Sequence, residues 1–170
     1  KDIGFFGDLE YSLSIKERFF GYREAIKKFL KFNNFKEAEV FIEEQSVLYD
    51  VEQNIIDKNI EGIKERINRI NKIPEAFVCS NDNAAIALIT SLKELGYMVP
   101  KDIAVVGFDD IVLSSLIEPK LTTVRVEKDF MGRKAVDRLL WRIENKKDPD
   151  EKTILSVEVI ERDSVGNKNI

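Results

Sequence analysis

The amino-acid sequence predicts an α/β protein built on a doubly wound parallel sheet, and three features support this prediction. Short runs of β-branched and aromatic residues alternate with longer segments of helical periodicity along residues 1–110. The short runs are apolar at nearly every position, as in strands that are buried on both faces of a parallel sheet. Alternation of strands and helices favours right-handed crossovers, which place helices on the sheet faces.

The elements follow from these patterns in chain order. We expect buried strands in four segments: 3–7, 38–42, 75–79 and 103–107. Helices are expected where apolar residues recur at three- and four-residue steps, in segments 14–30, 50–70 and 83–95. The pattern then changes to a short turn-rich helix, an extended segment, a further helix and a last strand, at 111–116, 121–126, 127–143 and 154–160. The first four strands are expected to form one sheet, and the last strand is expected to belong to the same subdomain.

Composition argues against several classes of function. The 170 residues carry a formal net charge of -4, so the chain lacks the clustered basic residues that bind nucleic acid. It has no histidine and one cysteine, Cys79, which excludes a histidine-based catalytic relay and makes a zinc site untenable. No glycine-rich phosphate loop follows the first strand. We therefore expect no catalytic residue, no metal and no cofactor.

Two further absences concern the cellular location. The sequence contains no run of about 18 apolar residues, so no membrane-spanning helix and no membrane partner are expected. It shows no charged-then-apolar leader of the kind that directs export. Both observations favour a cytoplasmic protein.

Polar side chains follow the predicted strands at the edge where open parallel sheets bind ligands. Asp8 follows the first strand, Asn81 the third, and Phe108 and Asp109 the fourth, while Arg18 lies near the start of the first helix. Carboxylates and amides accept hydrogen bonds from vicinal hydroxyls, and arginine donates to hydroxyl and ring oxygens. An aromatic ring can lie against the C–H face of a sugar. These residues predict a site for a neutral polyol.

Each of these residues also has a purely structural interpretation. Asn81 can cap the helix that follows it, a role that asparagine favours. Asp109 can belong to a turn or a cap, and Arg18 can lie on a solvated helix face. Glu43 and Glu44, after the second predicted strand, are interpreted as a charge pair at a strand end. The binding-site interpretation depends on several of these side chains meeting at one edge of one sheet.

Four blocks of sequence occur in a characteristic order: PEAFVCSND at 74–82, KDIAVVGFDD at 101–110, PKLTTVR at 119–125 and MGRKAVDRLL at 131–140. They resemble consecutive blocks of the lactose/galactose-repressor family of bacterial transcription regulators. RFFG at 18–21 and VEVIER at 157–162 resemble that family more loosely. The resemblance covers nearly the whole chain.

The resemblance implies a periplasmic-binding-protein-like fold of type I, in which two α/β subdomains hold an effector between them. Residues 1–122 and 153–165 would form the C-terminal subdomain, and residues 123–152 would be a crossover segment of an otherwise absent N-terminal subdomain. The DNA-binding headpiece has no counterpart in the chain. The family's effector contacts carry over to Arg18, Asn81 and Asp109, which would bind the hydroxyls and ring oxygen of a sugar or similar molecule.

The chain departs from the family pattern at two places near the site. Many members carry an aromatic residue in the loop after the second strand, where Val47 or Tyr49 stands nearest here. Val126 stands where some members place a polar effector contact. The resemblance therefore implies a small-molecule effector without naming it.

The resemblance also implies partners. Family members form homodimers through the helix at 83–95 and the turn near residue 116, which here present Ile86, Leu116 and Ile117. Operator DNA would be bound only through the headpiece. The apolar stripe of the helix at 127–143 would lose its usual cover, and we expect it to pack onto its own sheet, onto a second copy or by exchange between copies.

Two alternatives remain open. One is a transport-linked sugar-binding protein of the same fold, which the LTTVR block disfavours. The other is an enzyme that uses Glu43, Glu44, Asp109 and Asp110 as glycosidase carboxylates or Mg²⁺ ligands. Glycosidases need two carboxyl groups about 5 to 9.5 Å apart across the sugar bond, and nothing in the spacing demands that arrangement.

Overall fold

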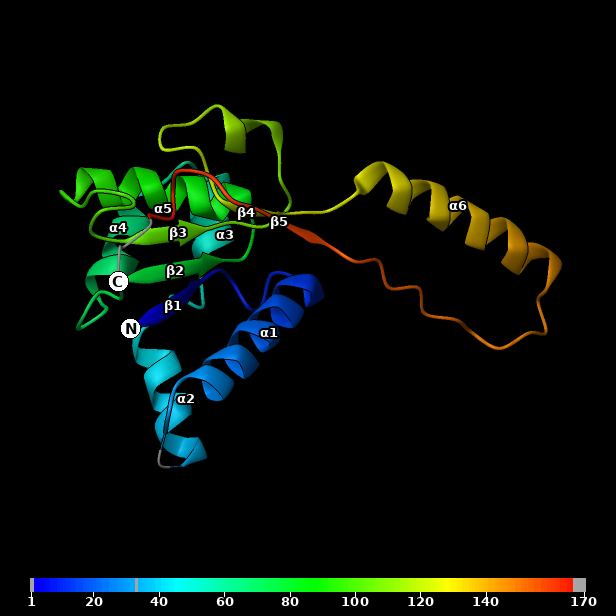
Figure 1. Ribbon diagram of the computed structural model, residues 1–170, viewed down its shortest axis with the longest axis horizontal. Coiled ribbons are helices and arrows are strands. Elements are labelled where there is room, and N and C mark those ends of the chain that lie inside the picture. The colour runs from blue at the N-terminus through cyan, green and yellow to red at the C-terminus, as the bar shows by residue number, and fades with distance from the viewer. Residues whose placement is uncertain (1, 33, 167–170) are drawn as a thin grey trace.

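The computed structural model describes residues 2–32 and 34–166 and has a parallel sheet at its centre (Figure 1). Strands β1 (Ile3–Phe6), β2 (Ala76–Cys79) and β3 (Ala104–Val106) lie in the order β1-β2-β3. Both pairs are parallel, with Phe5 opposite Val78 and Phe77 opposite Val105. The predicted α/β class and its parallel sheet are confirmed.

Seven helical segments surround or extend this sheet in the described chain. They are α1 (Leu13–Phe29), α2 (Phe35–Glu44), α3 (Val51–Ile56), α4 (Ile60–Asn68), α5 (Asp82–Glu94), the 3-10 helix η1 (Val112–Ser115) and α6 (Lys128–Glu144). The start of α1 shows the local reason for these boundaries, because the Ser12 hydroxyl accepts a hydrogen bond from the Ile15 N–H at 3.3 Å. No helix of the described chain is both long and apolar enough to cross a lipid bilayer.

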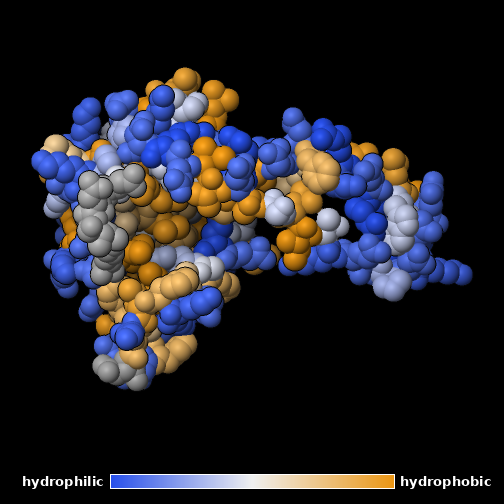
Figure 2. Space-filling model, viewed as in Figure 1, coloured by the Kyte–Doolittle hydropathy of each residue, from blue (hydrophilic) through white to orange (hydrophobic). Residues whose placement is uncertain are grey.

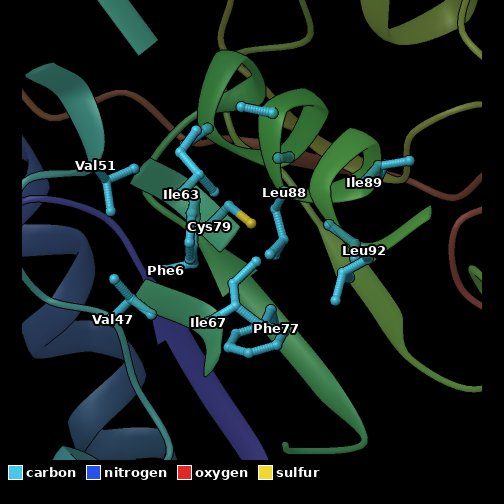
Figure 3. Close-up of a cluster of buried hydrophobic side chains, with 14 of the residues drawn as sticks. Phe6, Val47, Val51, Ile63, Ile67, Phe77, Cys79, Leu88, Ile89 and Leu92 are labelled. Carbon is cyan, nitrogen blue, oxygen red and sulfur yellow. The ribbon is translucent and has the colours of Figure 1, made fainter. Parts of the chain in front are cut away.

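The two faces of the sheet bury different side chains, as the alternation of a strand requires. Phe5 packs with α1 and α2, against a cluster of Ile15, Phe19, Tyr22, Ile26 and Ile42. Phe6 and Phe77 point to the opposite face, where they pack with α3, α4 and α5 (Figure 3). Helices therefore cover both faces, which is the doubly wound arrangement expected from the apolar strands.

The strand predicted at residues 38–42 is wrong, because this segment is the middle of helix α2. The Asn34 side chain caps α2 by accepting from the Glu37 N–H at 3.0 Å, and Ala38 and Ile42 are buried one helical turn apart. The segment around Val47, which follows α2, lies beside β1. Its N–H donates to the Phe5 carbonyl at 2.8 Å and its carbonyl accepts from Gly7 at 2.9 Å. It forms an isolated bridge, so the regular sheet has three strands where four were predicted.

The single helix predicted at residues 50–70 is two helices, α3 and α4, joined by a tight turn. Lys58 has a positive φ of 53°, which is incompatible with a continuous right-handed helix. Asn59 then caps α4 by accepting from the Gly62 N–H at 3.0 Å. The isoleucine periodicity runs across this turn because Ile63 and Ile67 of α4 are buried on the same sheet face against which Ile55 of α3 packs, partly buried. Ile56, also in the pattern, is 58% exposed.

Helix α6 projects away from the sheet on two extended connections (Figure 1). Strand β4 (Thr123–Arg125) leads to it, and strand β5 (Glu158–Ile160) returns antiparallel to β4. The last strand is thus shorter than the predicted 154–160 and belongs to a separate two-stranded ribbon. The return is tied to the sheet further on, where the Ser164 carbonyl accepts from the Val105 N–H at 3.0 Å.

No residue of α6 is buried in the described chain, so the helix does not pack onto its own sheet. Helix α6 and its two extended connections form a projecting arm, along which hydrophobic side chains remain in solvent (Figure 2). They are Phe130, Met131, Val136, Leu139, Leu140 and Ile143. The expectation that this stripe packs onto the sheet of its own chain is therefore wrong. Packing onto a second copy and exchange between copies stay predictions.

Candidate functional site

Arg18 contacts two of the residues that were predicted to meet it at the carboxyl edge of the sheet, Asp109 and Phe108. Its Nη1 donates to the Ser80 carbonyl at 2.6 Å, and its Nη2 donates to Asp109 Oδ1 at 3.1 Å. The guanidinium carbon lies 3.9 Å from the centre of the Phe108 ring, a cation–π distance. Residues from α1 and from the ends of β2 and β3 are thereby joined, and the interpretation of Arg18 as a freely solvated residue is wrong.

Asn81 stands between β2 and α5 and has two partners within the protein. Its Oδ1 accepts from the Ala84 N–H at 2.8 Å, which makes it the N-cap of α5. Its Nδ2 donates to Glu52 Oε1 at 3.1 Å. The capping interpretation is confirmed, and it leaves one amide N–H and one lone pair for a further partner.

Asp109 and Asp110 are neighbours that serve different partners. Both have positive φ angles, 113° and 48°, so the chain turns sharply after β3. Asp109 bonds Arg18, and burial raises the pKa of its carboxyl above the ordinary value although the Arg18 charge lowers it. Its other carboxylate oxygen, Oδ2, makes no hydrogen bond to any residue that the structure describes.

Asp110 is held by Arg125 of β4 and by Arg162, which follows β5. Arg125 Nε lies 2.7 Å from Oδ2, and Arg162 Nη2 lies 2.5 Å from Oδ1. Burial alone would raise the pKa of Asp110, but hydrogen bonds from these arginines hold it below the ordinary value. Its carboxylate is therefore occupied, which disfavours the enzyme alternative that required it.

Glu52 is a residue of the site that sequence reasoning missed. It lies on α3, is 6% exposed, and accepts from the Ser80 hydroxyl at 2.8 Å as well as from Asn81. Burial raises the pKa of its carboxyl, and the nearby charge of Asp8 adds to this rise. Asp8 is thus at the same edge, although the structure gives it no bond to Arg18. The signal for Glu52 was hidden inside an isoleucine-rich helical pattern that predicted core alone.

The remaining predicted residues are placed differently. Glu43 and Glu44 end helix α2 and line a hollow of about 310 Å³ together with Arg66 and Arg69, so they do not follow a strand. Ile86 and Ile117 are partly buried against the core, whereas Leu116 is 72% exposed.

Comparison with known proteins places the chain in a family. A model described as "Periplasmic binding protein-like domain" matches residues 1–165. The HTH-type transcriptional regulator RegA of Clostridium saccharobutylicum is 33% identical over 96% of this chain and 46% of its own length. The chain spans less than half the length of the curated relatives it matches.

Solved structures agree on the fold. A transcriptional regulator LacI from Bacillus cereus subsp. cytotoxis superposes with a TM-score of 0.78 at 22% identity, over 98% of this chain and 55% of the other. A LacI family transcriptional regulator from Enterococcus faecalis, solved with bound ribose, gives 0.72 at 21% identity, over 96% and 54%. The chain belongs to the periplasmic binding protein-like domain family.

Proposed function

We propose that the chain is the effector-binding and dimerisation part of a bacterial DNA-binding transcription regulator. The effector is a sugar or a similar small polar molecule, bound by Arg18, Asn81 and Asp109 with Phe108 against its apolar face. The observation that carries this proposal is that Arg18 contacts Asp109, Phe108 and the carbonyl of Ser80, the residue before Asn81, at the carboxyl edge of the sheet. In open α/β sheets this edge is where ligands bind.

The chemistry of the edge fits a hydroxyl-bearing effector. Asp109 has one oxygen free of protein hydrogen bonds in the described structure, and Asn81 retains one N–H. A carboxylate and an amide can take two adjacent hydroxyls, while Phe108 offers an apolar surface already stacked on Arg18. The E. faecalis regulator, which has this fold, was solved with ribose, and this supports a sugar as the first ligand to test.

The proposal includes the domain boundaries. Residues 1–122 and 153–165 form one subdomain, and residues 123–152 cross into a second that other parts of the protein supply. Exposure of the α6 stripe supports this division. Binding of the effector would close the two subdomains and alter the spacing of paired DNA-binding headpieces in the cytoplasm. Such closure regulates operator affinity only if the effector binds one conformation better than the other.

Dimerisation is proposed through α5 and the turn near η1. Leu116 is 72% exposed and Val112 is 79% exposed on this side of the molecule. Ile86 and Ile117, which are partly buried, would complete an apolar patch with them. Light scattering of wild type and of Leu116→Glu would test the patch, because a buried charge should dissociate the dimer.

Calorimetric titration of the intact regulator with D-ribose and cellobiose, which were bound in structures of this fold, tests the effector site. Asp109→Ala is expected to weaken the binding of whichever probe binds by about 10- to 100-fold, since it removes a charged acceptor. Glu65→Ala, an exposed carboxylate on α4, is the matched control and should leave affinity unchanged. Unaltered affinity in Asp109→Ala would show that Asp109 serves only the loop. The alternative of a transport-linked sugar-binding protein would predict sugar binding without any effect on DNA.

A further inference from the structure

Glu52 is a buried carboxylate behind the effector residues. Its side chain reaches from α3 to the end of β2, where Oε1 accepts from both the Ser80 hydroxyl and the Asn81 amide. The second oxygen, Oε2, is buried and has no hydrogen-bond partner of normal geometry among the described residues. Burial raises the pKa of this carboxyl, because removing a charged group from water costs free energy. A carboxylate buried at such a cost is a candidate for a specific role in holding its partners.

The contacts of Glu52 determine which way the Asn81 amide faces. In the observed orientation Oδ1 accepts from the Ala84 N–H and Nδ2 donates to Glu52. The flipped orientation would place the amide N–H groups against the Ala84 N–H and the amide oxygen against the carboxylate. Both contacts would then be repulsive, so the pair of partners excludes the flip.

Ser80 extends the same control to Arg18. The Ser80 side chain is fully buried and donates to Glu52, while its carbonyl accepts from Arg18 Nη1 at 2.6 Å. One carboxylate therefore bonds two adjacent residues, Asn81 itself and Ser80, whose carbonyl accepts from Arg18. Glu52 itself is only 6% exposed, so it acts on the site through Ser80 and Asn81.

We propose that Glu52 is a positioning residue of the effector site, which fixes the Asn81 amide so that it presents an N–H donor to the ligand. The effector must then bring an acceptor oxygen, such as a hydroxyl, ring or carbonyl oxygen, to Asn81. This inference rests on the proposed function for its meaning. Its structural part, the fixed amide, can be measured without any effector.

The test is nuclear magnetic resonance of the ¹⁵N-labelled chain without added ligand, observing the side-chain NH₂ group of Asn81. In Glu52→Ala we expect hydrogen exchange of this group about 10-fold faster than in wild type, because its charged acceptor is lost. Glu52→Gln retains an acceptor oxygen and should restore slow exchange. Glu65→Ala, on the exposed face of α4, is the control and should match wild type.

Glu52→Asp keeps the charge but shortens the side chain by one methylene, and serves if the alanine variant does not fold. It should also give faster exchange. Wild-type exchange at Asn81 in a folded alanine or aspartate variant would overturn the proposal, as would loss of protection in Glu52→Gln. Because no effector is present, these outcomes are independent of the titrations that test the proposed function.

Discussion

Replacing Asp82 with alanine is expected to destabilise the chain more than any change at the effector edge. The carboxylate is 1% exposed at the start of α5. Its Oδ2 accepts from the Ile111 N–H at 2.9 Å and the Ser114 hydroxyl at 2.5 Å, and its Oδ1 accepts from the Thr123 hydroxyl at 2.5 Å. One side chain thus joins α5 to η1 and to the strand that leads into the projecting arm.

The magnitude follows from the number of partners. A hydrogen bond to a charged group contributes about 1.5–3 kcal/mol, and each buried donor left without a partner costs about 1–3 kcal/mol. These contributions are not additive, and single substitutions rarely exceed about 4–5 kcal/mol. We therefore expect Asp82→Ala to lower the free energy of unfolding by about 3–5 kcal/mol. Asp82→Asn keeps the shape and part of the acceptor capacity, and should cost about 1–2 kcal/mol.

Urea denaturation followed by circular dichroism measures both variants. Asn83→Ala, an exposed neighbour on the same helix, is the matched control and should fall within about 0.5 kcal/mol of wild type. A loss below about 1 kcal/mol in Asp82→Ala would refute the reasoning, because the three donors would then have found other partners.

Two further predictions concern the ribbon and the arm. The pKa of Asp110 is lowered by its arginine partners, so its contribution to stability is present above the ordinary value of 3.8 and is lost as pH falls through the lower folded value. Asp110→Asn should therefore be less stable than wild type at pH 7, and the difference in urea midpoint should close in acid; a difference that persists unchanged would contradict this. Leu139 on α6 is 61% exposed, so Leu139→Ala should change the stability of this chain by at most about 0.5 kcal/mol, whereas a loss above about 2 kcal/mol would reveal that the stripe is covered.

Much of the architecture could be predicted because it depends on local apolar patterns. The strand IAVVG and the neighbouring strand at β2 are apolar on both faces, and only a sheet covered by helices on both sides buries them. The convergence of Arg18 with Asp109 was likewise predictable, since parallel strands end at one edge. Residues 38–42 could not be assigned in this way, because AEVFI suits a strand by its apolar residues and a helix by the spacing of Ala38 and Ile42.

The sequence by itself determined the fold class, the edge at which the polar side chains meet and the family. Only the tertiary structure showed that Glu52 of α3 reaches Ser80 at the end of β2. It also showed that Asp109 pairs with Arg18 whereas its neighbour Asp110 pairs with Arg162, and that α6 stands free of the sheet. The physical reason is range. Apolar periodicity and strand-end chemistry act over a few residues, whereas the partner of a buried carboxylate is chosen among groups distant in sequence that only the folded chain brings within hydrogen-bond reach.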